Sequence, residues 1–142
     1  MTATQPTIIR LQNLSKTYGN GENAVHALND INLDIKQGEI FGVIGLSGAG
    51  KSTLVRCINY LERPTAGEVI VDKQELGKLS QAELNRARQS MGMIFQQFNL
   101  LMQKTALENI CFPLEIAKTP KKQAVQRAQE LLEMVGLADK TN

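Results

Sequence analysis

The first part of the chain alternates short apolar runs with turn-rich segments, a pattern that predicts β-strands. Residues 7–11 form a short strand-like run, and the glycine-rich stretch 18–23 predicts a hairpin loop. Residues 31–35 carry isoleucine or leucine at every second position, which is typical of a half-buried strand. Residues 40–44, IFGVI, are apolar throughout and therefore predict a strand that is buried on both faces.

The pattern after residue 44 changes to a glycine turn followed by helical spacing. Apolar side chains recur on one face over residues 52–61, which predicts a helix. Residues 68–72 and 91–95 again read as strands.

Helix-capping signals dominate the later part of the chain. Ser80 and Glu83 have the spacing of a capping box and predict a polar helix that runs to about residue 90. Thr105 and Glu108 repeat that spacing. We expect Pro113 to interrupt the helix that they begin, because proline has no backbone N–H to donate.

The last periodic segment predicts another helix. Thr119 is expected to cap it, with Pro120 at its first position, and apolar residues then recur at helical spacing over 124–135. Gly136 is expected to end it. Strands therefore precede residue 96, and helices follow it.

Composition narrows the class of protein. A chain of 142 residues with 42% hydrophobic and 21% charged residues is typical of one folded domain and excludes a disordered or fibrous protein. The net charge of +2 is too small to indicate a nucleic-acid-binding protein. The start of the chain does not resemble a signal peptide, and no apolar run approaches the roughly 18 residues of a membrane span. Cys57 and Cys111 are expected to be buried thiols rather than a disulfide or metal site.

The strongest chemical signal is the stretch Gly45-Leu46-Ser47-Gly48-Ala49-Gly50-Lys51-Ser52, which matches the phosphate-loop pattern G-x-x-x-x-G-K-[ST]. Glycines let the backbone turn its N–H groups toward an anion, and the helix that follows adds the favourable end of its dipole. Lys51 is expected to reach the β- and γ-phosphates, and the Ser52 hydroxyl is placed to ligate Mg²⁺. A chance glycine turn is the alternative, which background composition produces in fewer than roughly one chain in a hundred.

With this loop, two flanking features make the chain resemble the ATP-binding subunit of ABC transporters. An aromatic residue, Tyr18, stands directly before the turn-rich stretch 19–23, at the place where that family stacks an aromatic ring on adenine. Gln96 follows the strand at 91–95, where the family places a glutamine that touches Mg²⁺ and the attacking water. A packing tyrosine and a polar strand end are the alternatives for these two residues.

The resemblance implies a set of site residues. Lys51 and Gln96 take the catalytic roles, and Ser52 and Gln96 ligate Mg²⁺. The cofactors implied are ATP and Mg²⁺. The nucleotide-binding set combines Tyr18 with most of the loop: Gly45, Ser47, Gly48, Ala49, Gly50, Lys51, Ser52 and Thr53.

The resemblance covers the whole chain, and residues 56–72 and 93–101 look most similar to the methionine-importer branch. It implies an α/β fold: a P-loop NTPase (RecA-like) core with an antiparallel β subdomain over residues 1–96, and the start of a helical subdomain over 97–142. A second ATP-binding subunit, transmembrane permease subunits and, indirectly, a substrate-binding protein are the implied partners. The implied location is the cytoplasmic face of the membrane. Where the family usually has V-D-G, Lys73 departs from it and puts that hairpin turn in doubt.

Some elements that the family needs for hydrolysis do not occur in these 142 residues. We find no apolar strand that ends in Asp-Glu, no separate LSGGQ-type loop and no later histidine, since the single histidine, His26, reads as a solvated hairpin residue. We therefore expect an N-terminal portion of a longer protein, incomplete relative to the family, marginally stable alone and not catalytically competent.

Two alternative functions stay open. One is a module that binds nucleotide or permease without turnover. The other is a different phosphate-loop enzyme, such as a GTPase or a small kinase. The guanine-recognition pattern N-K-x-D and a late arginine-rich lid do not occur in the sequence, which disfavours the second alternative.

Overall fold

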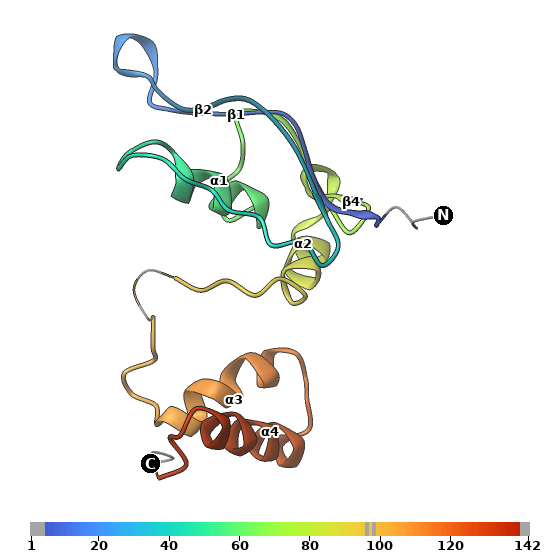
Figure 1. Ribbon diagram of the computed structural model, residues 1–142, viewed down its shortest axis with the longest axis vertical. Coiled ribbons are helices and arrows are strands. Elements are labelled where there is room, and N and C mark those ends of the chain that lie inside the picture. Colours follow the sequence, from blue (N-terminus) through green and yellow to red (C-terminus); the bar gives the residue numbers. More distant parts are fainter. Residues whose placement is uncertain (1–4, 96, 98, 140–142) are drawn as a thin grey trace. The chain divides into compact units, whose positions relative to one another are not determined.

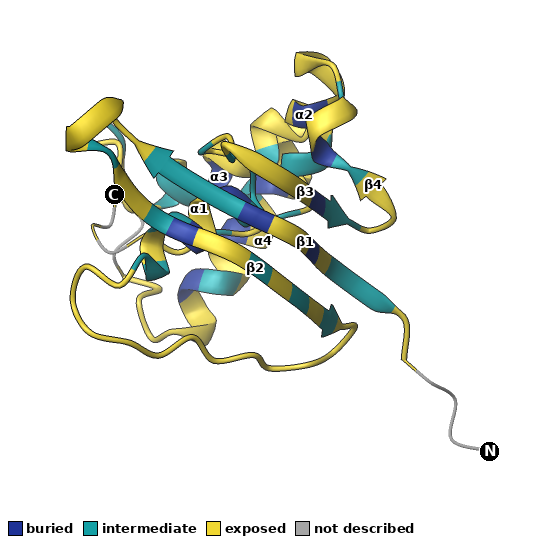
Figure 2. Cartoon of the chain, turned by 90° about the horizontal axis from the view of Figure 1, so that it is seen from above, coloured by how far each residue is buried: buried dark blue, intermediate teal, exposed yellow. Residues whose placement is uncertain are grey.

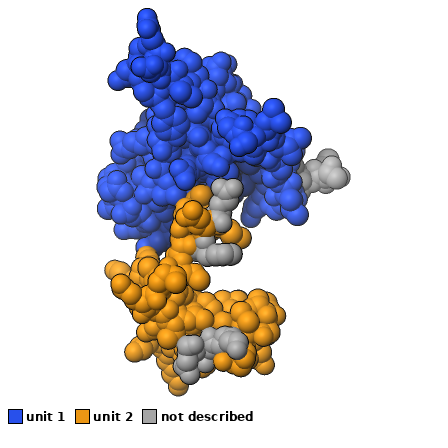
Figure 3. Space-filling view, turned by 90° about the vertical axis from the view of Figure 1, so that its left-hand side faces the viewer, with its two compact units in different colours: residues 1–91 blue, residues 92–142 orange. Residues whose placement is uncertain are grey.

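A computed structural model describes residues 5–95, 97 and 99–139. Contacts within the chain group it into two compact units, residues 1–91 and 92–142 (Figure 3). The division lies close to the subdomain boundary that the resemblance implies, which remains a prediction. Each unit is described by itself below.

The first unit is built on a four-stranded antiparallel sheet with the order β2-β1-β3-β4 (Figure 1). Its strands are β1 (Thr7–Tyr18), β2 (Val25–Lys36), β3 (Ala66–Val71) and β4 (Gln74–Glu75). The strands predicted at 7–11, 31–35 and 68–72 are confirmed. The hairpin loop predicted at 18–23 is also confirmed, and it contains a short 3-10 helix, η1 (Gly21–Asn23).

One face of this sheet carries the core of the unit. Leu11 of β1 pairs with Leu33 of β2 and with Val69 of β3, which places three apolar side chains on the same face. Leu11 and Val69 are each 1% exposed. Figure 2 shows buried positions along β1, β2 and β3. On the opposite face, Arg10 holds Asp34 through a bidentate contact of 2.7 and 3.0 Å.

Helices cover the apolar face. Helix α1 (Lys51–Ile58) contributes Leu54 and Cys57 to the core, and α2 (Gln81–Arg88) contributes Leu84. A short 3-10 helix, η2 (Leu76–Lys78), precedes α2. The helix predicted over 52–61 is confirmed, although α1 begins one residue earlier and ends at Ile58.

The capping box predicted at the start of α2 is confirmed. The Glu83 amide donates to the Ser80 hydroxyl, and the Ser80 amide donates to the Glu83 carboxylate over 2.8 Å. Hydrogen bonds from the Ser80 hydroxyl and amide lower the pKa of Glu83. The same local chemistry confirms the second box, in which Thr105 and Glu108 begin α3 (Ala106–Ile116).

The second unit packs α3 against α4 (Lys121–Met134), with Cys111, Ala124 and Ala128 buried between them. The prediction that Pro113 interrupts α3 is wrong, because the helix continues to Ile116. Proline there removes a single backbone donor, while its own carbonyl still accepts from the Ala117 amide at 3.1 Å.

The ends of α4 give one correction and one confirmation. The helix begins at Lys121 with Pro120 as its N-cap residue, so the prediction that Thr119 is the cap is wrong by one position. Gly136 ends the helix as predicted, with φ of 72°. Its amide and that of Leu137 donate back into the last turn of the helix, which is the paired bonding of a Schellman motif.

The strands predicted at 40–44 and 91–95 are wrong. Neither run forms a strand, and the residues Ile40, Ile44 and Ile94 are fully or almost fully exposed. A strand needs a neighbour that completes its hydrogen bonds. Within the described residues, β1 to β4 pair only with one another, so no strand is available beside either apolar run.

The turn between β3 and β4 gives the first testable prediction. Asp72 and Lys73 have φ of 46° and 64°, and Val71 pairs with Gln74 across them, as in a two-residue I′ hairpin. The turn that Lys73 put in doubt therefore forms, but with a side chain in the left-handed region. A Lys73→Gly variant is expected to raise the free energy of unfolding by about 0.5–1 kcal/mol, measured by urea denaturation, because glycine adopts this φ freely.

The control for this prediction is an exposed lysine with ordinary helical geometry. Lys122 lies in α4, where a glycine lowers stability by about 1 kcal/mol relative to a good helix former. Lys122→Gly should therefore shift the urea midpoint of its unit in the opposite direction. A loss of stability in Lys73→Gly would contradict the strain assigned to this turn.

Candidate functional site

The predicted phosphate loop is a tight turn that leads directly into α1. The Ala49 amide donates to the Leu46 carbonyl over 3.2 Å, and Gly48 and Gly50 have φ of 80° and 84°. Gly50 is the N-cap residue of α1, and its carbonyl accepts from the Leu54 amide at 2.8 Å. The loop thus ends where the free N–H groups of a helix begin.

The two left-handed glycines are required for different reasons. A Cβ atom at Gly50 would lie 2.3 Å from the backbone carbonyl oxygen of Ala27 in β2, so the loop backbone touches the sheet there. A Cβ atom at Gly48 would meet nothing within 4 Å, so only its backbone angle favours glycine. Gly50 therefore anchors the loop to β2.

The Lys51 side chain folds back onto the loop and bonds to its backbone. Its Nζ donates to the carbonyls of Gly45 and Leu46, each at 2.7 Å, and the side chain is half-buried. An ammonium group has three N–H donors, so one donor remains for an oxygen of a bound phosphate. The loop backbone therefore holds the Lys51 ammonium group in position before a phosphate binds.

The donors around this loop fit a polyphosphate with a divalent cation. Ser52 is exposed in the first turn of α1, where its hydroxyl could ligate Mg²⁺ alongside phosphate oxygens. Thr53 follows it and is half-buried. The positive end of the helix dipole and the backbone N–H groups of this turn favour an anion at the same place.

Tyr18 lies at the end of β1, on the same part of the hairpin as the loop contact. Tyr18 pairs with Val25 of β2, and Lys16, two residues earlier, pairs with Leu28 of β2. Leu28 is also the side chain nearest to the position of a Cβ at Gly50, at 3.3 Å. The Tyr18 side chain is 38% exposed and could be reached by a ligand. Whether it stacks on a base stays a prediction.

The remaining residues singled out from the sequence are a glutamine, a histidine and two cysteines. Gln96, predicted to be a catalytic and Mg²⁺-binding residue, lies outside the described residues. His26 is exposed, as predicted, with its Nδ1 3.0 Å from the Thr17 hydroxyl. Cys57 and Cys111 are free and buried, which confirms that prediction, and burial raises the pKa of the Cys57 thiol.

Sequence reasoning missed Lys16. Its Nζ lies 4.9 Å from the centroid of the Tyr18 ring and forms a 2.6 Å ion pair with Glu62. The available signal was the spacing, since residues two apart on a strand lie on the same face. The contact with Glu62 was not predictable, because it joins distant parts of the chain.

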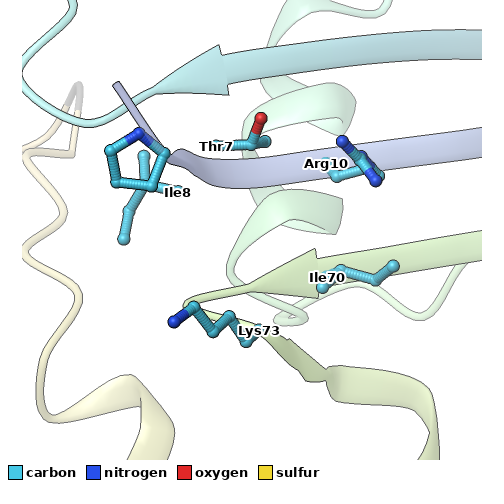
Figure 4. Close-up of a pocket in the computed structure, with 6 residues that line it drawn as sticks. Thr7, Ile8, Arg10, Ile70 and Lys73 are labelled. Atoms are coloured by element: carbon cyan, nitrogen blue, oxygen red, sulfur yellow. The ribbon is translucent and has the colours of Figure 1, made fainter. Parts of the chain in front are cut away.

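A separate hollow lies at the opposite end of β1, beside Thr7, Ile8 and Arg10 of that strand and Ile70 and Lys73 (Figure 4). In the register of the hairpin, Thr7 pairs with Lys36, whereas Tyr18 pairs with Val25 at the other end. The hollow therefore does not belong to the phosphate loop.

Among the described helices, none is long and apolar enough to cross a membrane.

A phosphate loop that opens a helix, anchored on an antiparallel sheet, defines a P-loop nucleotide-binding protein. Comparison with known families narrows this class. The sequence model of the ABC transporter family matches residues 28–142, so the chain belongs to the ABC transporter family. The predicted family and fold class are thereby confirmed, although two of the predicted strands are absent.

Individual relatives agree with this assignment. The chain is 53% identical, over 94% of its length, to the methionine import ATP-binding protein MetN of Escherichia coli strain K12, and covers 39% of it. It is 55% identical, over 95% of its length, to the MetN of Desulfitobacterium hafniense strain Y51, and covers 40% of it. The chain therefore spans about two-fifths of the length of these curated relatives.

Solved structures give the same result for the fold. The chain superimposes with a TM-score of 0.84 and 39% identity on a dimeric post-hydrolysis state of the ATP-binding cassette MJ0796 bound to ADP and Pi. The match covers 94% of this chain and 60% of that one. A second dimeric structure of MJ0796, a bacterial ABC transporter cassette, gives a TM-score of 0.85 at 40% identity, with the same coverage.

Proposed function

We propose that this chain binds Mg-ATP as the ATP-binding subunit, or its N-terminal portion, of an ABC importer for amino acids, with methionine as the substrate. The observation that carries the proposal is the loop at 45–52, in which the Lys51 ammonium is held by two loop carbonyls with a donor to spare. The 53–55% identity to methionine import proteins supports the choice of substrate.

In the proposed mechanism, each residue of the loop has a physical task. The backbone at Gly48 and Gly50 turns N–H groups toward the phosphates, and Lys51 places its remaining donor on a phosphate oxygen. The Ser52 hydroxyl would hold Mg²⁺, which would supply positive charge to neutralise the phosphates. Tyr18 stacks on the base. By the family resemblance, Gln96 would be a further Mg²⁺ ligand and would orient the attacking water.

Transport requires more than one polypeptide. Two ATP-binding subunits close around nucleotide at the cytoplasmic face of the membrane, and the permease subunits follow that movement. A substrate-binding protein delivers the amino acid to the permease. The dimeric arrangement of the MJ0796 cassettes supports the first of these steps.

A second candidate function is a module that holds nucleotide without turnover. The observation that favours it is the loop itself, in which the Lys51 ammonium and the left-handed Gly48 and Gly50 are suited to hold phosphate. The residues that hold a triphosphate and those that polarise water are distinct in this class of enzyme. Binding and hydrolysis can therefore be tested separately.

Calorimetric titration of the 142-residue chain with ATP, with and without Mg²⁺, should show binding that strengthens with the metal. Phosphate release from the same preparation should stay at the rate of the buffer. Turnover that disappears in Lys51→Ala would rule out the second candidate. Failure to bind Mg-ATP in a folded chain would contradict both candidates.

The substrate is tested in the assembled transporter. In membrane vesicles that hold the complex with its permease subunits, ATP should drive uptake of methionine. Uptake of another amino acid in its place would contradict methionine as the substrate while leaving the ATP-binding role intact.

A further inference from the structure

The Lys16 side chain is held at several points between the sheet and the segment that follows α1. Its Nζ lies 2.6 Å from the Glu62 carboxylate and donates to the Arg63 carbonyl at 2.8 Å. The same atom lies over the Tyr18 ring, 4.9 Å from the centroid. The side chain is only 13% exposed, so this charge is removed from most of the solvent.

The segment that holds Lys16 is itself fixed to both neighbouring elements. The Glu62 amide donates to the Arg56 carbonyl of α1 at 3.0 Å, and the Thr65 amide donates to the Ser15 carbonyl of β1 at 2.8 Å. The Thr65 hydroxyl also accepts from the Thr17 amide at 3.0 Å. The position of the ammonium group is therefore set by α1 and β1 together.

The two faces of the Tyr18 ring therefore have different surroundings, because Lys16 lies over only one of them. A cation over one face is attracted by the electron-rich centre of the ring and holds the ring in place. Since Lys16 lies over one face, only the other face is left for stacking, and Tyr18 is 38% exposed, so a ligand can reach this residue. A ring that is ordered before the ligand arrives loses less entropy when a base stacks on it.

We propose that Lys16 is a positioning residue for nucleotide recognition, which fixes one face of the Tyr18 ring so that the other face can stack on the base. The proposal rests on the role proposed above for Tyr18. It assigns Lys16 to the base and not to the phosphates, which belong to Lys51. A purely structural role for Lys16, as a link between the sheet and the segment after α1, is the competing explanation.

The test separates the base from the phosphates by comparing ATP with inorganic tripolyphosphate, each with Mg²⁺, in calorimetric titrations of the full chain. Lys16→Met should weaken ATP binding about 2- to 5-fold, the size of a partly exposed cation–π contact, and leave tripolyphosphate binding unchanged. Lys16→Arg should restore ATP binding. Lys16→Met added to Tyr18→Ala should cause no further loss, because the two residues act as one unit.

A second variant guards against loss of folding. Glu62→Gln keeps the Lys16 charge but loosens its hold, and it should weaken ATP binding less than Lys16→Met does, again without effect on tripolyphosphate. The chain has no tryptophan, so Tyr18→Trp adds a single tryptophan at the ring position, whose emission can be excited apart from that of Tyr60. Its quenching by ATP should diminish when Lys16→Met is added.

Each outcome decides the matter. Equal losses for ATP and tripolyphosphate in Lys16→Met would mean a structural role and overturn the proposal. A loss for ATP in Tyr18→Ala without one in Lys16→Met would overturn it and leave the role of Tyr18 standing. If Tyr18→Ala loses no affinity for ATP, the role proposed for Tyr18 fails and the role of Lys16 fails with it. ATP binding by the phosphate loop would remain.

Discussion

A Gly50→Ala variant is expected to lose at least about 3 kcal/mol of stability, which places it among the most damaging single substitutions. Two effects add at this residue. The φ of 84° costs an alanine about 1–2 kcal/mol. The new Cβ would also lie 2.3 Å from the Ala27 carbonyl oxygen, so the loop and β2 must separate. The measurement is urea denaturation followed by circular dichroism.

Gly48→Ala is the matched control. Gly48 lies two residues earlier in the same loop with nearly the same φ, 80°, but a Cβ there has no atom within 4 Å. It should lose only the backbone cost of about 1–2 kcal/mol. Equal losses in the two variants would contradict the anchoring of the loop by Gly50. The comparison uses stability alone, since both residues lie in the proposed phosphate site.

Lys51→Ala is expected to weaken binding of Mg-ATP about 10- to 100-fold, the range expected for loss of a hydrogen bond between charged groups. The substitution also frees the Gly45 and Leu46 carbonyls that Lys51 now holds. Tripolyphosphate should lose affinity by a similar factor, because this lysine serves the phosphates. Calorimetric titration with both ligands measures the effect.

Arg56→Ala is the control for charge. Arg56 is an exposed cation on the same helix, α1, so its removal changes the net charge equally. It should change the affinity for either ligand by less than about twofold, since exposed charges outside the site are screened by salt. Full affinity in Lys51→Ala would contradict the phosphate-binding role of the loop.

Local signals in the sequence predicted this structure well. The capping boxes at Ser80 and Thr105, the stop at Gly136 and the phosphate-loop pattern each depend on residues within a few positions of one another. Their chemistry is complete inside a short window, so the sequence contains all the partners. The predicted caps and the helix stop were confirmed or shifted by one residue, as at Thr119, whereas phosphate binding by the loop stays a prediction.

Features that depend on distant partners were predicted poorly. The apolar pattern at 40–44 is suited to a strand, but a strand also needs a neighbour, and the described sheet offers none. Lys16 was missed for the same reason, since its contacts at Glu62 and Arg63 lie on another element. The proline at 113 shows the converse, because packing of α3 on α4 outweighs a local helix-breaking signal.

The contact between the phosphate loop and the sheet has a consequence for how this site is recognised in other sequences. Gly50 touches a main-chain carbonyl, which every amino acid at position 27 would present in the same way. Exchanges at Ala27 therefore leave the contact intact and call for no compensating exchange at Gly50. Correlated substitution between the two positions would not reveal them as neighbours. The close approach of Gly50 to the Ala27 carbonyl oxygen is therefore visible in the structure but not in an analysis of correlated substitutions.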